Sequence, residues 1–276
     1  MKKVLALRCN SRPSAAIAAL LTMTCCLTIF VEQQTSAAHP GPAQSPVQDD
    51  VTAEIVEQAK NNFPALLQRA LANYKRKVRD YTGTLHKQER IKRKLGAQQV
   101  ISFRFKDKPF SVFMEWLKNP GPADRLLYVE GPGSNKMLVH PTGLLSWMKS
   151  LKRHPRSKAA RQSTLYTCDQ FGFRRLLIRL LDAYRLARQH RGAQTKYLGA
   201  ATVDGRNCIS VEILLPKPQE YQIRRIIVRF DPEYLLPVEL ERFDSSDNLI
   251  GRYTYKDLKF NVGLTDQHFT PEYNNL

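Results

Sequence analysis

The side chains that most often carry out chemistry in proteins are spread thinly along this chain. Beyond residue 39 there are five histidines, and none stands at a spacing from another His, Cys or acidic residue that looks like a metal site. They are His86, His140, His154, His190 and His268. We therefore expect these histidines to be structural or exposed to solvent, and we predict no metal and no cofactor.

Motifs for phosphate binding or nucleophilic catalysis are also missing. Residues 131–136 (GPGSNK) superficially suggest a phosphate-binding loop, but the Gly expected directly before Lys136 is missing and no Ser or Thr follows it. The segment is therefore more typical of a turn. No Gly-x-Ser-x-Gly motif occurs, and Cys168 has no basic partner nearby in the sequence. The sequence predicts no catalytic residues.

The first 38 residues have the order of a secretory signal peptide. Lys and Arg occupy four of the first twelve positions, residues 15–31 are apolar or small, and small residues at 35–38 precede His39. The export machinery recognises the basic start and the apolar segment, and its peptidase recognises the small residues before the cleavage site. We therefore expect residues 1–38 to be removed and the remainder to work in the periplasm or cell envelope. The alternative is an uncleaved N-terminal membrane anchor, although seventeen residues are at the lower limit for a span.

The chain is strongly basic, and this charge belongs to the part that follows the leader. The net charge of +18 falls only to +15 when the leader's four basic residues and one acidic residue are removed. Such a charge favours an anionic partner. Outside the cytoplasm we expect lipid headgroups, acidic polymers or another anionic envelope component, and no nucleic acid. A solvated basic surface without a dedicated ligand is the alternative. No later segment is apolar enough to span a membrane.

Helices are predicted in three segments. Residues 39–50 are rich in Pro and polar side chains and are typical of a flexible spacer. Apolar residues then recur every three or four positions in segments that begin at Val51 and at Pro64, the second running to about Asp80. A further amphipathic segment covers residues 169–190.

Strands are predicted where apolar residues alternate with polar ones, the period of a strand with one buried face. Gly- and Pro-rich turns separate the runs, and Asp204-Gly205 is typical of a hairpin. The order helix, strands, helix, strands predicts one α+β domain over residues 51–276. The runs are 101–106, 112–116, 126–129, 136–140, a strand around Tyr197, 209–215, 222–230, 237–243 and 249–260.

Several short segments resemble an uncharacterised family of bacterial exported proteins, the domain of unknown function 1571. They are Tyr81–Leu85 (YTGTL), Lys87–Arg90 (KQER), Lys108–Met114 (KPFSVFM), Leu127–Gly131 (LYVEG), Lys136–His140 (KMLVH) and Arg153–Pro155 (RHP). This family brings no known activity with it.

The order of elements is more distantly similar to the LolA/LolB-type lipoprotein carriers and the related periplasmic regulators of stress-sigma systems. The C-terminal segments 231–237, 247–249 and 261–264 with Phe269 are similar to the ending of that fold. The resemblance implies a curved, unclosed antiparallel sheet, a half-barrel of about ten strands, with two or more helices on its concave face. No residue of a carrier's ligand site matches position by position.

Two features are candidates for binding. The first is an aromatic and apolar face on the early strands, which would line a cavity for an acyl chain if the sheet is curved and unclosed. The alternative is an ordinary packed core beneath the helices. The residues of this face are Phe103, Phe105, Phe113, Trp116 and Tyr128.

The second candidate is a basic segment, residues 149–161, which holds no acidic residue and follows Trp147. We expect an exposed loop or arm that would be attracted to an anionic membrane surface; a merely solvated loop is the alternative. Its basic residues are Lys149, Lys152, Arg153, Arg156, Lys158 and Arg161.

Only Cys168 and Cys208 remain once the leader is removed, and in an oxidising compartment they would either pair or stay as two separate buried thiols. Taken together, the residues favour a non-enzymatic exported protein that receives a lipid or lipidated ligand on its concave face. One alternative is an interaction or sensory module that docks on anionic surfaces. Another is a hydrolase of an envelope polymer, because catalytic pairs can be assembled from distant residues.

Overall fold

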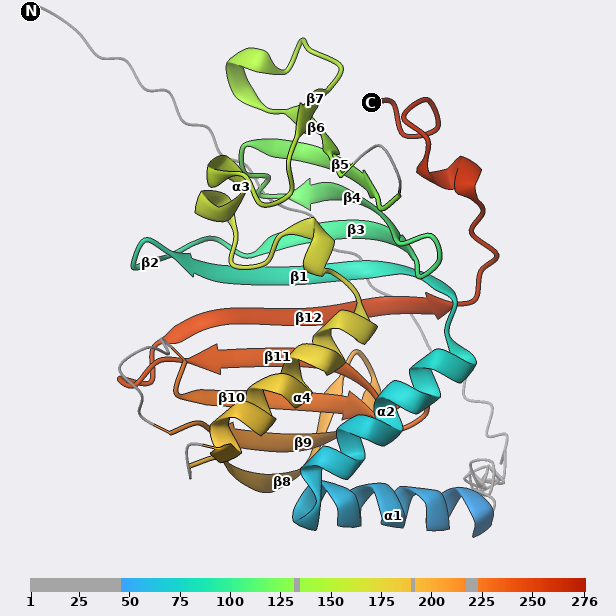
Figure 1. The fold of residues 1–276 in the computed structure, drawn as a ribbon, viewed down its shortest axis with the longest axis vertical. Coiled ribbons are helices and arrows are strands. Elements are labelled where there is room, and N and C mark those ends of the chain that lie inside the picture. Colours follow the sequence, from blue (N-terminus) through green and yellow to red (C-terminus); the bar gives the residue numbers. More distant parts are fainter. Residues whose placement is uncertain (1–45, 132–134, 190–191, 217–222) are drawn as a thin grey trace, which may run out of the picture. The chain divides into compact units, whose positions relative to one another are not determined.

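The computed structural model describes residues 46–276 except 132–134, 190–191 and 217–222, with side chains from residue 52 onward. The expected signal peptide, residues 1–38, lies outside the described residues, as do positions 39–45 of the expected spacer. Figure 1 follows the chain from α1 to its C-terminus.

One antiparallel sheet contains all twelve strands of the described residues, in the order β7-β6-β5-β4-β3-β1-β12-β11-β10-β9-β8, with the short β2 paired to β1 (Figure 1). No pairing among the described residues joins the edge strands β7 and β8, so the sheet is unclosed. The strands are β1 Asp80–Ile91, β2 Lys94–Leu95, β3 Gln99–Lys106, β4 Ser111–Lys118, β5 Ala123–Val129, β6 Met137–Pro141, β7 Leu151–Arg153, β8 Gln194–Val203, β9 Arg206–Leu214, β10 Arg225–Asp231, β11 Leu236–Phe243 and β12 Leu249–Phe260.

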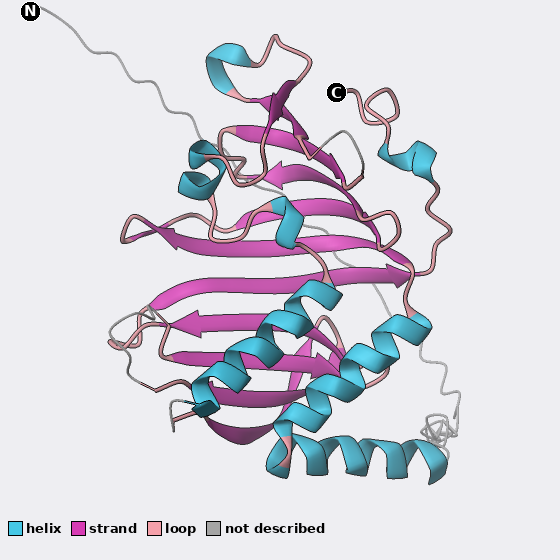
Figure 2. Cartoon of the chain, in the orientation of Figure 1, coloured by secondary structure: helices cyan, strands magenta, loops and turns pink. Residues whose placement is uncertain are grey.

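The four α-helices of the described residues gather on one face of this sheet, which we call the concave face. Figure 2 shows α2 and α4 crossing the half formed by β9 to β12, with α1 beside α2. Among the described residues the longer helices are α1 Pro46–Asn61, α2 Phe63–Lys77 and α4 Phe173–Gln189, and the short ones are α3 Lys158–Ser163, η1 Gly143–Leu145, η2 Cys168–Gln170 and η3 Asp266–Phe269. This arrangement confirms the predicted α+β class, the unclosed sheet and the covering helices. None of the helices in the described residues is long and apolar enough to cross a membrane.

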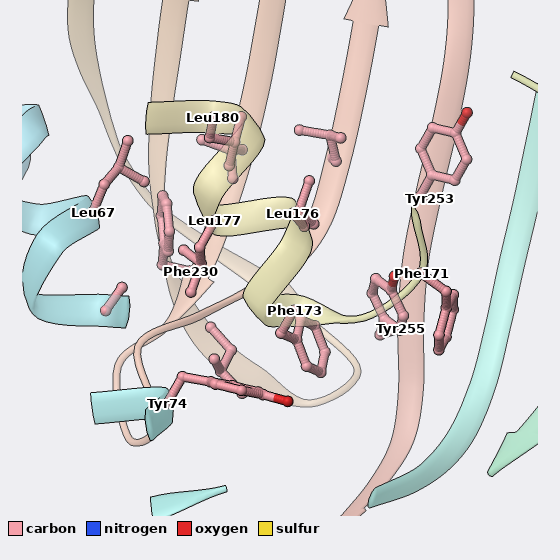
Figure 3. Packing of buried hydrophobic residues seen from close by; sticks show 14 of the residues in the cluster. Leu67, Tyr74, Phe171, Phe173, Leu176, Leu177, Leu180, Phe230, Tyr253 and Tyr255 are labelled. Carbon is pink, nitrogen blue, oxygen red and sulfur yellow. The ribbon is translucent and has the colours of Figure 1, made fainter. Parts of the chain in front are cut away.

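The main core lies between α2, α4 and the concave face. The Asn62 side chain caps α2 by accepting a hydrogen bond from the Ala65 backbone N–H at 3.2 Å, and Pro in the first turn suits a helix start. Phe173, fully buried at the first turn of α4, lies 4.7 Å from Tyr255 and 5.0 Å from Tyr81, centroid to centroid. Figure 3 shows its ring between α4 and β12, with Tyr253 further along the same strand.

The opposite, convex face is covered at β3 to β5 by the C-terminal segment. Phe269 of η3 packs with Phe113 and Leu127 in a separate small cluster. The Arg104 guanidinium lies 4.5 Å from the centre of the Phe113 ring and hydrogen-bonds Asn274. The last residues of the chain therefore stabilise the outside of the sheet and take no part in the concave face.

The structure departs from the sequence predictions at three places. α1 begins at Pro46, so residues 46–50 of the expected spacer are helical; Pro is favoured at a first helical position. The sheet has twelve strands, where about ten were expected, and the additions include the long central β1. The basic segment 149–161 is not one loop, because it contains β7 and most of α3.

Candidate ligand cavity

A cavity of about 330 Å³ lies against the concave face of β1 to β7. Its floor is mainly apolar and takes at least one apolar side chain from each of six neighbouring strands. These include Leu85, Ile101, Met114, Leu126, Val139 and Leu151. The floor continues across β12 and β11 through Tyr253 and Leu240. The arrangement follows from strand geometry, because alternate residues of every strand share one face.

The roof of the cavity is residues 154–172, which we call the strap. The strap contains α3 and η2 and contributes Ala160, Tyr166 and Phe171 to the lining. It joins α4 at Gly172, whose φ of +95° lies in the left-handed region. A Cβ there would approach the Phe105 ring to 2.9 Å, so glycine meets both a conformational and a packing demand.

Polar contacts hold the strap in place at two points. The Arg156 Nε donates to the Asp169 carboxylate at 2.7 Å. Burial alone would raise the pKa of Asp169, but hydrogen bonds from Thr167 and Arg156 outweigh it and leave this pKa below its usual value. At the second point the Thr164 hydroxyl donates to the Glu89 carboxylate of β1 at 2.9 Å. These contacts tie the roof to itself and to the floor.

Glu89 is the centre of a polar cluster in the cavity wall. It is buried, and its carboxylate also accepts a hydrogen bond from the Tyr253 hydroxyl at 2.7 Å and pairs with the Lys87 ammonium at 3.4 Å. Burial, followed by the negative charge of Glu89, raises the pKa of Tyr253 well above its ordinary value, so this hydroxyl stays protonated and donates. The charge of the Glu89 carboxylate is therefore already balanced by Lys87, and its oxygens already accept hydrogen bonds from Tyr253 and Thr164.

Two arginines stand at the far end of the cavity against the ring of Tyr166. The Arg242 guanidinium carbon lies 4.4 Å from the ring centre and that of Arg179 lies at 5.0 Å. Arg179 donates to the Gln170 carbonyl at 2.7 Å. Burial lowers the pKa of both guanidinium groups. The same three side chains also line a second cavity of about 300 Å³ beneath α4, so they stand where the two cavities meet.

Of the five side chains proposed for the apolar face, the structure places only Trp116 in the cavity wall. Phe103 and Phe105 are 1% exposed and belong to the packed core with Tyr81, and Tyr128 is buried against Phe110.

The proposed placement of Phe113 is wrong, because this residue lies on the convex face. Its cross-strand partner is Arg104, whereas Met114 pairs with Phe103 on the concave face. Successive side chains of a strand point to opposite faces, so the alternation along β4 places Phe113 opposite Met114 and Trp116.

The basic segment exposes its charged side chains, whereas its Pro155 is buried. All six of its Lys and Arg residues have exposed side chains, and Arg156 is also paired with Asp169. Lys152 and Arg153 lie on the edge strand β7, and Arg153 lines the cavity. Residues 143–148, which we call the tip, precede this segment and carry Leu144 at 97% and Trp147 at 80% exposure.

Cys168 and Cys208 are both free thiols in the structure. Cys168 lies in the main core with its sulfur 3.7 Å from that of Met137, whereas Cys208 packs with Val203 and Val238 in a different cluster. Burial raises the pKa of Cys168 to about 12 and that of Cys208 to about 11. The structure therefore has two separate buried thiols rather than a disulfide, and burial keeps both of them protonated.

The sequence comparisons place the chain in a family. The model for a protein of unknown function (DUF1571) matches residues 78–275, which is most of the chain. The chain belongs to this family. In this DUF1571 protein the matched region begins at the end of α2, so it includes the whole sheet, the strap and α4. No curated protein matches the sequence.

Several solved structures are similar to this DUF1571 protein at low identity. The Pseudomonas aeruginosa MucA/MucB complex matches with 10% identity and a TM-score of 0.41, over 81% of this chain and 60% of that chain. A putative outer membrane lipoprotein-sorting protein domain from Vibrio parahaemolyticus matches with 10% identity and a TM-score of 0.36, over 82% and 97%. The Mycobacterium tuberculosis lipoprotein LppX matches with 12% identity and a TM-score of 0.41, over 73% and 98%. The DUF1571 protein spans less than two thirds of the MucB chain.

The polar side chains of the cavity were not found from the sequence. Lys87 and Glu89 lie on β1, a strand that the apolar alternation did not reveal. Arg242 lies two positions after Leu240 on β11 and shares its face, so continuing the alternation by one step would have placed it inward. Arg179 lies three positions after Leu176 on α4, on the same side of the helix, which was the available signal for this residue.

Proposed function

We propose that this protein is an exported, non-enzymatic binding protein that holds the apolar chain of a lipid or lipidated ligand in the cavity between the concave face and the strap. The observation that carries the proposal is the cavity itself, which has an apolar floor across successive strands and a separate roof. Ligand pockets of this kind combine apolar walls with few polar groups. The leader supports an envelope location, where such ligands are abundant.

The size of the cavity fits a chain-like ligand. Its volume of about 330 Å³ is roughly twice that of the ~150 Å³ apolar cavity that takes up one benzene molecule. The lining extends from β11 through β12 and β1 to β7, which is seven strand spacings. At about 4.8 Å for each spacing, this path is roughly 34 Å long. A long, thin apolar ligand suits it better than a compact one.

Filling the cavity should abolish binding. Ala160 lies on α3 in the roof and lines the cavity, so Ala160→Trp would place an indole in the space for the chain. We expect this change to weaken binding of a fluorescent fatty-acid probe at least about tenfold, because forcing extra atoms into an occupied site costs roughly 1–3 kcal/mol. Fluorescence titration of the purified protein measures the effect.

The matched control is Ala72→Trp, which adds the same side chain to an exposed position of α2. This variant should bind the probe as the wild type does. Saturable probe binding by Ala160→Trp at wild-type affinity would contradict the proposal, and so would a wild-type protein that neither binds the probe nor copurifies with lipid.

A second candidate function is docking on an anionic membrane through the tip and the basic segment. Large apolar side chains are rarely as exposed as Leu144 and Trp147, and here they stand next to Lys149 and Lys152. Trp suits the membrane interface, and each basic residue near an anionic surface contributes about 1 kcal/mol of attraction. The tip also reaches the cavity, because Leu145 lines it. Docking here would bring the cavity to the bilayer.

Charge reversal tests this second function. Lys149→Glu with Lys152→Glu should weaken binding to phosphatidylglycerol vesicles at least about tenfold at low salt, because attraction is replaced by repulsion. Cosedimentation measures the bound fraction, which should also fall as salt is added. Lys196→Glu with Lys259→Glu reverses two other exposed charges and is the control. Equal losses in both variants would indicate a general charge effect and would rule out a dedicated docking segment.

A further inference from the structure

Arg242 is a buried cation without a carboxylate partner. It is 7% exposed, its Nε has no hydrogen-bond partner in the described part of the chain, and no acidic group there lies within ion-pairing distance of it. Its contact is the face of the Tyr166 ring. Buried charges are normally paired, because desolvating an unpaired one is costly. A protein that keeps such a group in the wall of a cavity has a use for it there.

The nearest carboxylate is kept away from Arg242 by the packing of the strands. Arg242, Gly251 and Glu89 form one row across β11, β12 and β1. Gly251 has no side chain, and the Tyr253 ring lies so close that a Cβ on Gly251 would be 3.0 Å from it. The Tyr253 ring thus covers the position between the two charges. The Glu89 carboxylate is already held by Tyr253, Thr164 and Lys87 and does not pair with Arg242.

We propose that Arg242, supported by Arg179, is the binding site for the oxyanion headgroup of the ligand, so that the protein takes anionic amphiphiles rather than neutral lipids. This inference rests on the proposed function, because it assigns the headgroup end of the same cavity. A guanidinium binds a carboxylate or a phosphate through paired N–H donors, and burial strengthens such contacts.

The surroundings of Arg242 fit an anion. Arg179 adds a second positive charge against the same Tyr166 ring, and it donates a hydrogen bond to a neutral backbone carbonyl. Two cations beside one ring repel each other until an anion joins them. Two other acidic groups lie nearby. The charge of Asp169 acts on Arg179, but this carboxylate is held by Arg156 at 2.7 Å. Asp182, in the second cavity, has a side chain that is 65% exposed and lies near Arg185, at 3.8 Å. The apolar floor begins beside Arg242 at Leu240 and extends across the sheet. The apolar chain of the ligand would lie on this floor.

Three ligands of equal chain length test the proposal: tetradecanoate, tetradecyl phosphate and tetradecanol. Each competes, below its micelle-forming concentration, with a neutral naphthylamine probe bound to the wild type, to Arg242→Met and to Arg252→Met. Arg252 lies on the convex face and serves as the matched control. In the wild type we expect the anionic ligands to bind at least about tenfold more tightly than tetradecanol, as for a charge-assisted hydrogen bond. Arg242→Met should remove this preference without changing the affinity for tetradecanol.

The outcomes separate this inference from the proposed function. Equal affinity of the wild type for all three ligands, or an unchanged preference in Arg242→Met, overturns the headgroup site and leaves the cavity as a binding site for chains. Failure of all three to bind overturns both proposals. Inorganic phosphate alone is the last arm: if it displaces the probe as well as tetradecyl phosphate does, the site recognises a free anion and the inference is wrong. A preference between the carboxylate and the phosphate would identify the headgroup.

Discussion

Phe173→Ala should lower the free energy of unfolding by about 3–5 kcal/mol, the range for removing a fully buried Phe. Phe173 is 0% exposed and stands where the strap becomes α4. Its ring contacts Tyr81 of β1 and Tyr255 of β12, the two central strands that join the halves of the sheet. The Tyr81 hydroxyl also accepts a hydrogen bond from the Phe173 backbone N–H at 3.1 Å. Loss of the ring would leave a void that neither strand can fill without moving. Urea unfolding followed by circular dichroism measures the change.

The control for this prediction is Ile178→Ala on the same helix. Ile178 is 38% exposed, so its truncation removes little buried surface and should cost less than about 1 kcal/mol. Similar losses in the two variants would mean that the start of α4 is not anchored as the structure indicates. An intact cavity in Phe173→Ala, shown by unchanged probe binding, would contradict the role of this ring in holding the strap to the sheet.

The parts of the fold that the sequence revealed are those where one physical signal acts alone. The amphipathic spacing of Leu176, Leu177 and Leu180 identified α4, because this helix has one buried and one solvated side. Asp204 and Gly205 form the two-residue connection between β8 and β9, both with positive φ, as that pair of residues predicts. In each case the residue types that favour the local structure are also the ones that suit their place in the folded protein.

The central strand β1 was not predicted from the sequence, because some of its concave-face positions are apolar and others are charged. Leu85 is followed on the same face by Lys87 and Glu89, so the apolar alternation stops where the cavity wall begins. A strand whose concave face is polar resembles a loop when it is judged by hydrophobicity. Such departures are expected at functional sites, where residues needed for binding replace the apolar residues that a strand would otherwise carry.

The candidate site was predicted only in outline for a related reason. Aromatic residues on alternating strands indicate a buried face, but the same pattern describes a packed core and a ligand cavity. Phe103 and Phe105 of β3 pack in the core against Tyr81 and Phe171, while Ile101 on the same strand and Met114 on the neighbouring β4 line the cavity. The strap decides between the two outcomes, and its residues 154–172 carry no periodicity that would place them over the sheet.

Arg242→Met should raise the free energy of unfolding of the ligand-free protein by about 1–3 kcal/mol, although it removes a native side chain. The wild type keeps a desolvated guanidinium whose Nε has no hydrogen-bond partner in the described part of the chain. Met is flexible and apolar, and it can occupy the same space against Tyr166. Most core substitutions destabilise a protein, so a gain here would identify Arg242 as a residue retained for binding rather than for stability.

A matched arginine on the other face of the sheet should respond in the opposite direction. Arg229 donates to Glu239 at 2.7 Å and to Glu241 at 2.9 Å, so Arg229→Met removes a charged donor from both carboxylates, which keep Thr254 and Arg252, and should lower stability by about 1–3 kcal/mol. Adding tetradecanoate at about 100 times its dissociation constant should stabilise the wild type by about 2.7 kcal/mol and Arg242→Met by much less. Urea unfolding with and without the ligand measures both effects. A loss of stability in ligand-free Arg242→Met would show that this guanidinium is satisfied within the protein and has no need of an anionic ligand.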